Sequence, residues 1–412
     1  MKLHEFVLAA FVLIWRSKCV FSYGVGTQIG STRTVLHDIG VSSVQLSSSV
    51  LKGMRLLVGT KRGALLETFI GADSTSSNVK QLDDMHAQEL KPIYSMINFE
   101  LSLGSAWRNE TSQIIACGGG DRFVTIWQSL STLPQPYISA RLGPHTGWVK
   151  DVVYDHENHK LFTIGCNFIE IWHKEIEVGT QDKKDCLEKK EGSITWVKGP
   201  QLKIESCPLN GSTLSSDLLC LCLDNPKEPK LLFSGGVDGR IHVWDTGRLD
   251  EDTNPIQAFS AHDGRVNKIV IATQAKVLFS IGHDGTLQCI DLSLGNRTFH
   301  NDLVRDSKTI TCTDDESSRL LSLCIVQDGI DVSSVAVGTS NGSVHLMHIR
   351  RKEDKSIEIF SRKGEYVELQ GRPSIHAVSA SRHITNDIGR FSHHTIAIGH
   401  SKGLTLWDIK VN

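Results

Sequence analysis

The sequence is poor in proline and has almost no excess of charge of either sign. Its 412 residues include only 10 prolines, and 44 Lys+Arg are balanced by 46 Asp+Glu. Few prolines exclude a proline-rich or collagen-like chain. A formal net charge of −2 gives no general attraction to nucleic acid or to anionic membranes. Because 40% of the residues are hydrophobic, the chain can bury a large core, and we expect a folded protein with no nucleic-acid partner.

Metal-binding and cofactor-binding motifs are also missing. The 10 cysteines form no Cys-x-x-Cys pair, and Cys220 and Cys222 lie in an apolar run, where two thiols on one strand face act as small hydrophobic groups. The three glycines at 118–120 are followed by Asp and Arg rather than by the Lys-Ser/Thr of a phosphate loop. His345 and His348 would point to opposite faces of a strand. We therefore expect no metal ion and no cofactor, and scattered cysteines favour a reducing compartment.

The longest apolar run lies near the N-terminus, at residues 6–15. It is shorter than the ~20 residues with which a helix spans a bilayer, so no membrane span is expected. The run fits the hydrophobic part of a signal peptide over residues 1–22, although Arg16 and Lys18 are unusual near a cleavage site. The alternatives to a signal peptide are that the run forms an extra buried strand or helix, or that the start of the gene is misassigned. We expect residues 1–26 to lie outside the fold, and favour the cytoplasm or nucleus, with the secretory pathway open if the signal is real.

A β-hairpin pattern recurs along the rest of the chain. Residues 231–245 contain an apolar run, a Gly/Asp turn and an alternating run that ends in Trp-Asp, which is typical of a hairpin. Most hairpins are preceded by one short apolar strand and followed by another. Seven such units without a long amphipathic helix predict an all-β fold, a single seven-bladed β-propeller of four-stranded antiparallel blades. The other six hairpins are predicted at 55–69, 114–127, 161–172, 277–291, 335–347 and 395–408.

The end of the chain predicts how the ring closes. Trp407-Asp408 ends the third strand of the seventh unit, and only four residues follow. Residues 33–36 precede His37 as residues 256–259 precede His262, so they can supply the missing fourth strand and remove the exposed edges. We place the propeller at residues 27–412. A charged insertion at about 174–216 is expected to include the outer strand of its blade.

These repeats resemble those of the WD40-repeat family of β-propellers. Two units end in Trp-Asp, at Trp244 and Trp407, and two others keep only the Trp, at Trp127 and Trp172. The Gly-His signal of the family is reduced to a His before the first strand, as at His262. The resemblance implies a non-catalytic scaffold that binds other proteins through loops on the propeller faces. It also implies that the chain is a subunit of a larger complex and not an enzyme.

The resemblance further implies a hydrogen-bonded network of a His, a turn Asp, a Ser/Thr and the Trp inside a blade. A catalytic Ser-His-Asp set is the alternative interpretation of the same residues. It would need an exposed nucleophile and an oxyanion hole, whereas the repeat places these groups between strands. The residues expected to form the structural network are His262, Ser280 and Asp284 in one blade and Ser234, Asp238 and Trp244 in another.

Exposed large or charged side chains beside the turns are the candidates to contact a partner. They are Arg122, Trp148, Arg265 and His283. The alternative function is that of substrate receptor of a cullin–RING ubiquitin ligase, because such receptors of the family often carry Trp-Asp-x-Arg after a hairpin. Here Arg248 stands one place late and Lys410 replaces the Arg, so both units depart from that motif.

Overall fold

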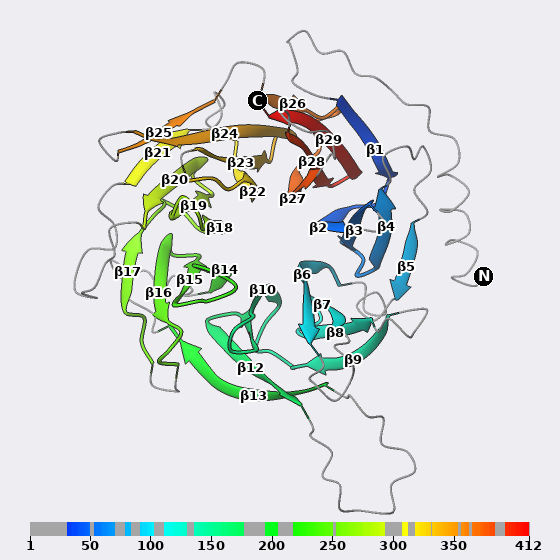
Figure 1. The fold of residues 1–412 in the computed structure, drawn as a ribbon, viewed down its shortest axis with the longest axis vertical. Coiled ribbons are helices and arrows are strands. Elements are labelled where there is room, and N and C mark those ends of the chain that lie inside the picture. The colour runs from blue at the N-terminus through cyan, green and yellow to red at the C-terminus, as the bar shows by residue number, and fades with distance from the viewer. Residues whose placement is uncertain are drawn as a thin grey trace, which may run out of the picture.

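The computed structural model is a closed ring of seven β-sheets around a central channel (Figure 1). The expected leader at residues 1–26 and much of the expected insertion at 174–216 lie outside the residues that it describes. Within the described residues, no helix is long and apolar enough to cross a membrane. The structure describes residues 31–49, 53–70, 79–83, 91–102, 111–129, 136–176, 194–204, 217–249, 253–292, 307–311, 318–330, 332–352, 356–361, 365–383 and 392–411.

Each blade is an antiparallel sheet whose first strand lines the channel and whose last strand lies outermost. Blade 1 consists of β2 (Val41–Ser49), β3 (Gly53–Thr60), β4 (Leu65–Ile70) and β5 (Lys80–Asp83); blade 2 of β6 (Ile93–Ser102), β7 (Thr111–Gly119), β8 (Val124–Ser129) and β9 (Tyr137–Leu142); blade 3 of β10 (Val149–Asp155), β11 (Lys160–Gly165), β12 (Phe168–Ile176) and β13 (Ile194–Lys203).

The remaining blades repeat this order. Blade 4 consists of β14 (Leu218–Leu223), β15 (Leu231–Gly236), β16 (Arg240–Asp245) and β17 (Gln257–Ser260); blade 5 of β18 (Val266–Ala272), β19 (Val277–Gly282), β20 (Thr286–Asp291) and β21 (Ser307–Thr311); blade 6 of β22 (Leu320–Gln327), β23 (Val332–Thr339), β24 (Ser343–Arg351), β25 (Ile357–Phe360) and β26 (Tyr366–Glu368); blade 7 of β27 (Ile375–His383), β28 (Ser392–His400), β29 (Gly403–Val411) and β1 (Ser31–His37).

The seven predicted hairpins are the second and third strands of the seven blades, so the predicted fold class is confirmed. Their turns depend on residues that tolerate a positive φ. In blade 4, Gly239 has φ 77°, and a Cβ there would lie 2.2 Å from the backbone oxygen of His262. Only glycine allows both this conformation and this close approach.

The predicted closing strand is also confirmed. Strand β1 pairs with β29 in an antiparallel register that sets Ser31 opposite Asp408 and Leu36 opposite Leu404. Figure 1 shows the two strands, blue and red, side by side in blade 7. The first described strand therefore supplies the outermost strand of the last sheet, so blade 7 is built from both ends of the described chain and the ring is closed.

Blade 6 differs from the others because its outer position is divided between β25 and β26, which both pair with β24. The division coincides with a buried polar contact. His348 of β24 lies 2.6 Å from the carboxylate of Glu365, which directly precedes β26, and its other ring nitrogen lies 2.7 Å from Ser334 Oγ. The Glu365 carboxylate thus satisfies the buried histidine, while its backbone oxygen still accepts from the N–H of Leu346 in β24.

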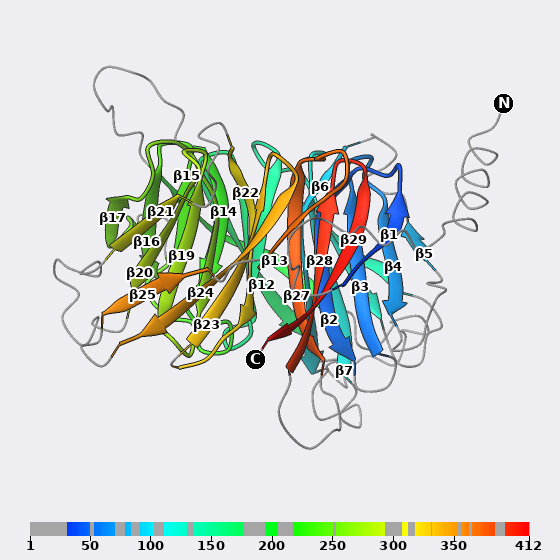
Figure 2. The ribbon, with the colours of Figure 1, turned by 90° about the horizontal axis from the view of Figure 1, so that it is seen from above.

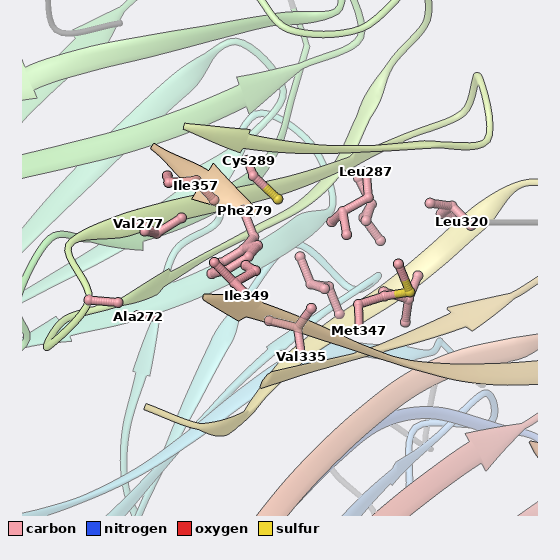
Figure 3. Close-up of a cluster of buried hydrophobic side chains, with 14 residues drawn as sticks. Ala272, Val277, Phe279, Leu287, Cys289, Leu320, Val335, Met347, Ile349 and Ile357 are labelled. Atoms are coloured by element: carbon pink, nitrogen blue, oxygen red, sulfur yellow. The ribbon is translucent and has the colours of Figure 1, made fainter. Parts of the chain in front are cut away.

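Apolar side chains between neighbouring blades form the core. The cluster in Figure 3 joins Phe279 and Leu287 of blade 5 to Leu320, Val335 and Met347 of blade 6. Phe279 is fully buried, and burial of such a side chain contributes roughly 2–3 kcal/mol. Similar clusters lie between other neighbouring blades. This packing fixes the blades around the channel and so determines which side chains meet at its end.

The strand directions define two faces of the ring. We call the side on which the inner strands begin the entry face. It carries the turns between second and third strands and the loops that lead into the inner strands. The opposite side, the exit face, carries the turns between first and second strands. Figure 2 shows the ring from its side, with the strands running between these two faces.

Candidate functional site: the channel mouth

The central channel ends at the entry face in a cavity of about 600 Å³, which we call the channel mouth. It takes residues from the inner strands of all seven blades, because each inner strand begins here. Its lining is Ser42, Ser43, Val44, Lys61, Pro92, Tyr94, Ser95, Met96, Lys150, Asp151, Leu219, Asn267, Lys268, Leu321, Ser322, Leu323, His376, Ala377 and Val378.

Asp151 of β10 connects four consecutive blades at the floor of the channel mouth. Its carboxylate accepts hydrogen bonds from Ser95 Oγ of blade 2 (2.7 Å), the backbone N–H of Leu221 in blade 4 (3.0 Å) and Lys268 Nζ of blade 5 (2.6 Å). Asp151 itself is 2% exposed. Burial alone would lower the pKa of Lys268, but the adjacent carboxylate outweighs it and raises that pKa. The Lys268 ammonium is therefore charged, and its contact with the carboxylate ties the blades together across the channel.

Two basic side chains, Lys61 and His376, contact each other on the other side of the channel mouth. Lys61, in the turn after β3, places its Nζ 2.9 Å from Nε2 of His376 in β27. Burial, and then the nearby Lys61 charge, lower the pKa of His376 to about 4. The ring is therefore neutral at pH 7, and its nitrogen accepts a hydrogen bond from the ammonium group.

Trp148, Tyr94 and Lys150 form an aromatic and cationic cluster at the rim. The rings of Tyr94 and Trp148 stack with centroids 5.8 Å apart. Lys150 Nζ lies 3.7 Å from the Tyr94 ring centroid and 4.6 Å from that of Trp148, which are cation–π distances. Burial, and then the charge of Arg265, lower the pKa of Lys150. Trp148 is 52% exposed, so the cluster presents a large apolar surface next to a positive charge.

The structure places all four residues predicted to contact a partner on the entry face. Arg122 and His283 lie in turns between second and third strands, whereas Trp148 and Arg265 lie in loops that lead into inner strands. Arg122, Trp148 and Arg265 are exposed and His283 is half-buried. Only Trp148 of the four belongs to the rim cluster. Arg248, on which the ubiquitin-ligase alternative depends, lies on the exit face, where it is 86% exposed at 3.9 Å from Asp245.

Sequence reasoning missed Tyr94, Lys150, Asp151 and Lys268. A signal for the charged residues exists in the chain. In Trp148-Val149-Lys150 and in Arg265-Val266-Asn267-Lys268, a lysine follows the first buried residue of an inner strand by one or two positions. An alternating strand pattern alone gives such polar positions no special meaning, because half of the residues of any half-buried strand are polar.

The expected blade networks contain contacts in blade 5, between His262, Ser280 and Asp284, and in blade 4, between Ser234 and Trp244. His262 Nε2 lies 2.9 Å from Ser280 Oγ, and His262 Nδ1 lies 3.1 Å from Asp284, so the order of contacts is that of a Ser-His-Asp triad. Ser280, however, is fully buried, and a substrate cannot reach its hydroxyl. The geometry favours the structural interpretation.

In blade 4 the Trp244 indole N–H donates to Ser234 Oγ over 3.0 Å. Asp238 takes no part in that bond. Its carboxylate accepts from the backbone N–H of Arg240, and one of its oxygens lies 3.8 Å from His242 Nε2. Blade 3 contains a further network: Thr163 Oγ1 contacts His145 Nε2 at 2.8 Å and accepts from the Trp172 indole at 3.2 Å. These bonds tie strands and loops within blades 3, 4 and 5, and in blade 4 the turn Asp is not part of the Ser-Trp contact.

Acidification is expected to weaken the entry face. Burial, followed by His37, His376 and Lys402, lowers the pKa of His400 to about 4, against 6.5 when unfolded. The unfolded chain therefore binds a proton first as the pH falls from 6.5 to 4, and the free energy of unfolding decreases over that window. We expect His400→Gln to reduce this loss by about 2 kcal/mol between pH 7 and pH 4.5 in urea titrations. An unchanged slope against pH would show that His400 does not titrate in this way.

A closed ring of seven antiparallel blades, six with four strands and one with five, defines the chain as a β-propeller. The family model for the WD domain, G-beta repeat, matches residues 208–245, which include β14, β15 and β16. The match lies within blade 4, and together with the seven-bladed ring and the relatives below it shows that the chain is similar to WD40-repeat β-propellers.

Three relatives illustrate the similarity. Nuclear distribution protein PAC1 of Ajellomyces capsulatus is 25% identical over 214 residues, 50% of this chain and 41% of the relative. The p21-activated protein kinase-interacting protein 1-like of Danio rerio is 26% identical over 135 residues, 33% of this chain and 34% of the relative. Nuclear distribution protein PAC1 of Arthroderma benhamiae is 23% identical over 271 residues, 62% of this chain and 52% of the relative. The chain thus matches about half or less of each relative's length.

Proposed function

We propose that the protein is a non-catalytic scaffold that binds partner proteins at the entry face, as part of a larger complex. The observation that carries this proposal is the rim cluster, in which an exposed tryptophan stacks on a tyrosine beside a lysine at the opening of a cavity. Exposed aromatic side chains at the edge of a pocket are typical anchors of protein interfaces.

The comparisons support this proposal. One relative carries the words interacting protein in its name, and none of the three names describes an enzymatic activity. The one arrangement of the blade networks that resembles a catalytic triad has a fully buried serine. A role in binding is therefore better supported than a role in catalysis.

We also propose that the protein works in the cytoplasm or the nucleus. Cys117, Cys220 and Cys324 form no disulfide, and burial raises the pKa of Cys117 and of Cys324 to about 12. Such thiols are unreactive, and their presence as free cysteines favours a reducing compartment.

The proposal is tested by affinity capture of the full-length chain with quantitative mass spectrometry. We expect Trp148→Ala to reduce the retained partner proteins at least tenfold, because it removes the aromatic anchor. Ile330→Ala is the matched control, since Ile330 is 69% exposed but lies in the turn between β22 and β23 on the exit face. Retention that Trp148→Ala leaves unchanged, or that Ile330→Ala removes instead, would contradict the proposal.

A further inference from the structure

We propose that the channel mouth binds an acidic segment of a partner protein, with carboxylate side chains in the cavity and an apolar residue on Trp148. This inference rests on the proposed scaffold function and specifies the chemistry of the partner. It follows from the balance of charge in the cavity, from the way its lysines are held, and from the charge of the surrounding face.

The cavity has an excess of positive charge. Among the described residues that line it, three are lysines and Asp151 is the one acid. Asp151 is already neutralised by Lys268, and its carboxylate also accepts from Ser95 and from the backbone N–H groups of Leu221 and Val152. Three ammonium groups minus one carboxylate leave two uncompensated positive charges, those of Lys61 and Lys150.

The described part of the chain provides no carboxylate within ion-pair distance of either lysine. Lys61 donates to the neutral ring of His376, and Lys150 lies against the faces of Tyr94 and Trp148. These partners orient the ammonium groups without neutralising them. Asp217, which directly precedes β14, attracts the Lys150 charge but forms no ion pair with it. Burial lowers the pKa of both lysines, so an incoming carboxylate would relieve an existing electrostatic cost.

The entry face around the cavity is basic as well. Exposed cationic side chains on its turns and loops include Arg62, Arg122, Arg265, Arg319 and Lys402. Exposed acids there include Asp38, Asp263 and Glu368, the last of which lies 3.9 Å from Arg372. Such a surface attracts an acidic partner and raises its rate of association at low salt.

A protein segment fits this site better than a small anion alone. The two uncompensated lysines are contributed by different blades, Lys61 by blade 1 and Lys150 by blade 3. Trp148 beside them offers a half-exposed apolar surface that inorganic phosphate cannot use. A peptide supplies both several carboxylates and an apolar side chain.

The inference is tested by fluorescence anisotropy with the full-length chain and a labelled peptide of ten glutamates that contains one central leucine. We expect the double variant Lys61→Glu/Lys150→Glu to bind this peptide at least tenfold more weakly than the wild type. The matched control is Lys227→Glu/Lys276→Glu, which reverses two exposed lysines in turns of the exit face and should change the affinity less than twofold. Circular dichroism of each variant establishes that it is folded.

Three outcomes would overturn the inference: no binding of the peptide at 50 mM salt, equal binding by wild type and Lys61→Glu/Lys150→Glu, or equal loss in the control variant. Inositol hexakisphosphate serves as a second probe. If it binds at the same lysines more than a hundredfold more tightly than the peptide, the occupant is a small polyanion and not a protein segment.

The two proposals fail in different ways. If Trp148→Ala removes captured partners but Lys61→Glu/Lys150→Glu does not, the entry face binds proteins, and the inference that the partner contributes an acidic segment is wrong. If capture does not depend on Trp148, the scaffold proposal for this face fails, whatever the peptide does.

Discussion

Replacing Asp151 with alanine is expected to lower the free energy of unfolding by about 3–5 kcal/mol. The substitution leaves the Lys268 ammonium without its counter-charge and removes the acceptor for Ser95 Oγ and for the backbone N–H of Leu221. The Asp151 carboxylate is buried, whereas the Lys268 side chain is 34% exposed, so the loss comes both from the unpaired ammonium group and from the buried donors of Ser95 and Leu221. Urea denaturation followed by tryptophan fluorescence measures the difference.

Two further variants decide whether the ion pair causes this loss. Asp263→Ala removes an exposed carboxylate on the same face and should change the stability by about 0.5 kcal/mol or less. In Asp151→Ala/Lys268→Met, the unpaired charge is removed too, so the double variant should be more stable than Asp151→Ala alone. A double variant as unstable as the single one would show that the backbone and serine contacts, not the charge, determine the effect.

Replacing Gly403 with alanine is expected to open the ring at blade 7 and to cost about 3 kcal/mol or more. Gly403 begins β29, directly opposite His37 of the closing strand β1. A Cβ at this position would lie 2.0 Å from the backbone oxygen of Leu36, and a backbone atom cannot move aside without displacing the strand. Displacement of β1 also exposes Leu36, which is 2% exposed in the closed ring.

Gly371→Ala is the matched control for that experiment. Gly371 also has a positive φ, at 74°, but the one atom near its added Cβ is the flexible Lys402 Nζ. Alanine should therefore cost only the ~1–2 kcal/mol of a left-handed backbone. Hydrogen exchange adds a local readout, since Gly403→Ala should increase the exchange of β1 and β29 before that of other blades. Equal loss of stability in both variants would contradict the role of Gly403 in closure.

The fold could be predicted from the sequence because each blade contains a hairpin pattern within a short, continuous segment. The turn at 235–239 and the apolar runs on both sides form one hairpin within 15 consecutive residues, and the same arrangement recurs seven times. Closure was predictable for the same reason, since residues 33–36 precede His37 as other outer strands precede the next blade. Neither prediction required knowledge of contacts between distant residues.

The channel mouth could not be predicted because no local segment contains it. Asp151 and Lys268 are 117 positions apart, and Lys61 and His376 are 315 apart. Each is an ordinary polar residue of a strand or turn until the ring brings the inner strands together. The contact between Glu365 and the buried His348 escaped prediction similarly, because the two residues lie 17 positions apart and meet only in the folded blade.

The most direct test of the account is site-specific photo-crosslinking from the full-length protein, with a photoreactive phenylalanine analogue at position 148 or at position 330. The two positions lie on opposite faces and are both well exposed, at 52% and 69%. The account predicts that a partner protein is crosslinked from position 148, through a segment rich in Asp and Glu, and not from position 330. Crosslinking from position 330 alone, or from neither position, would contradict the claim that this propeller binds its partner at the channel mouth.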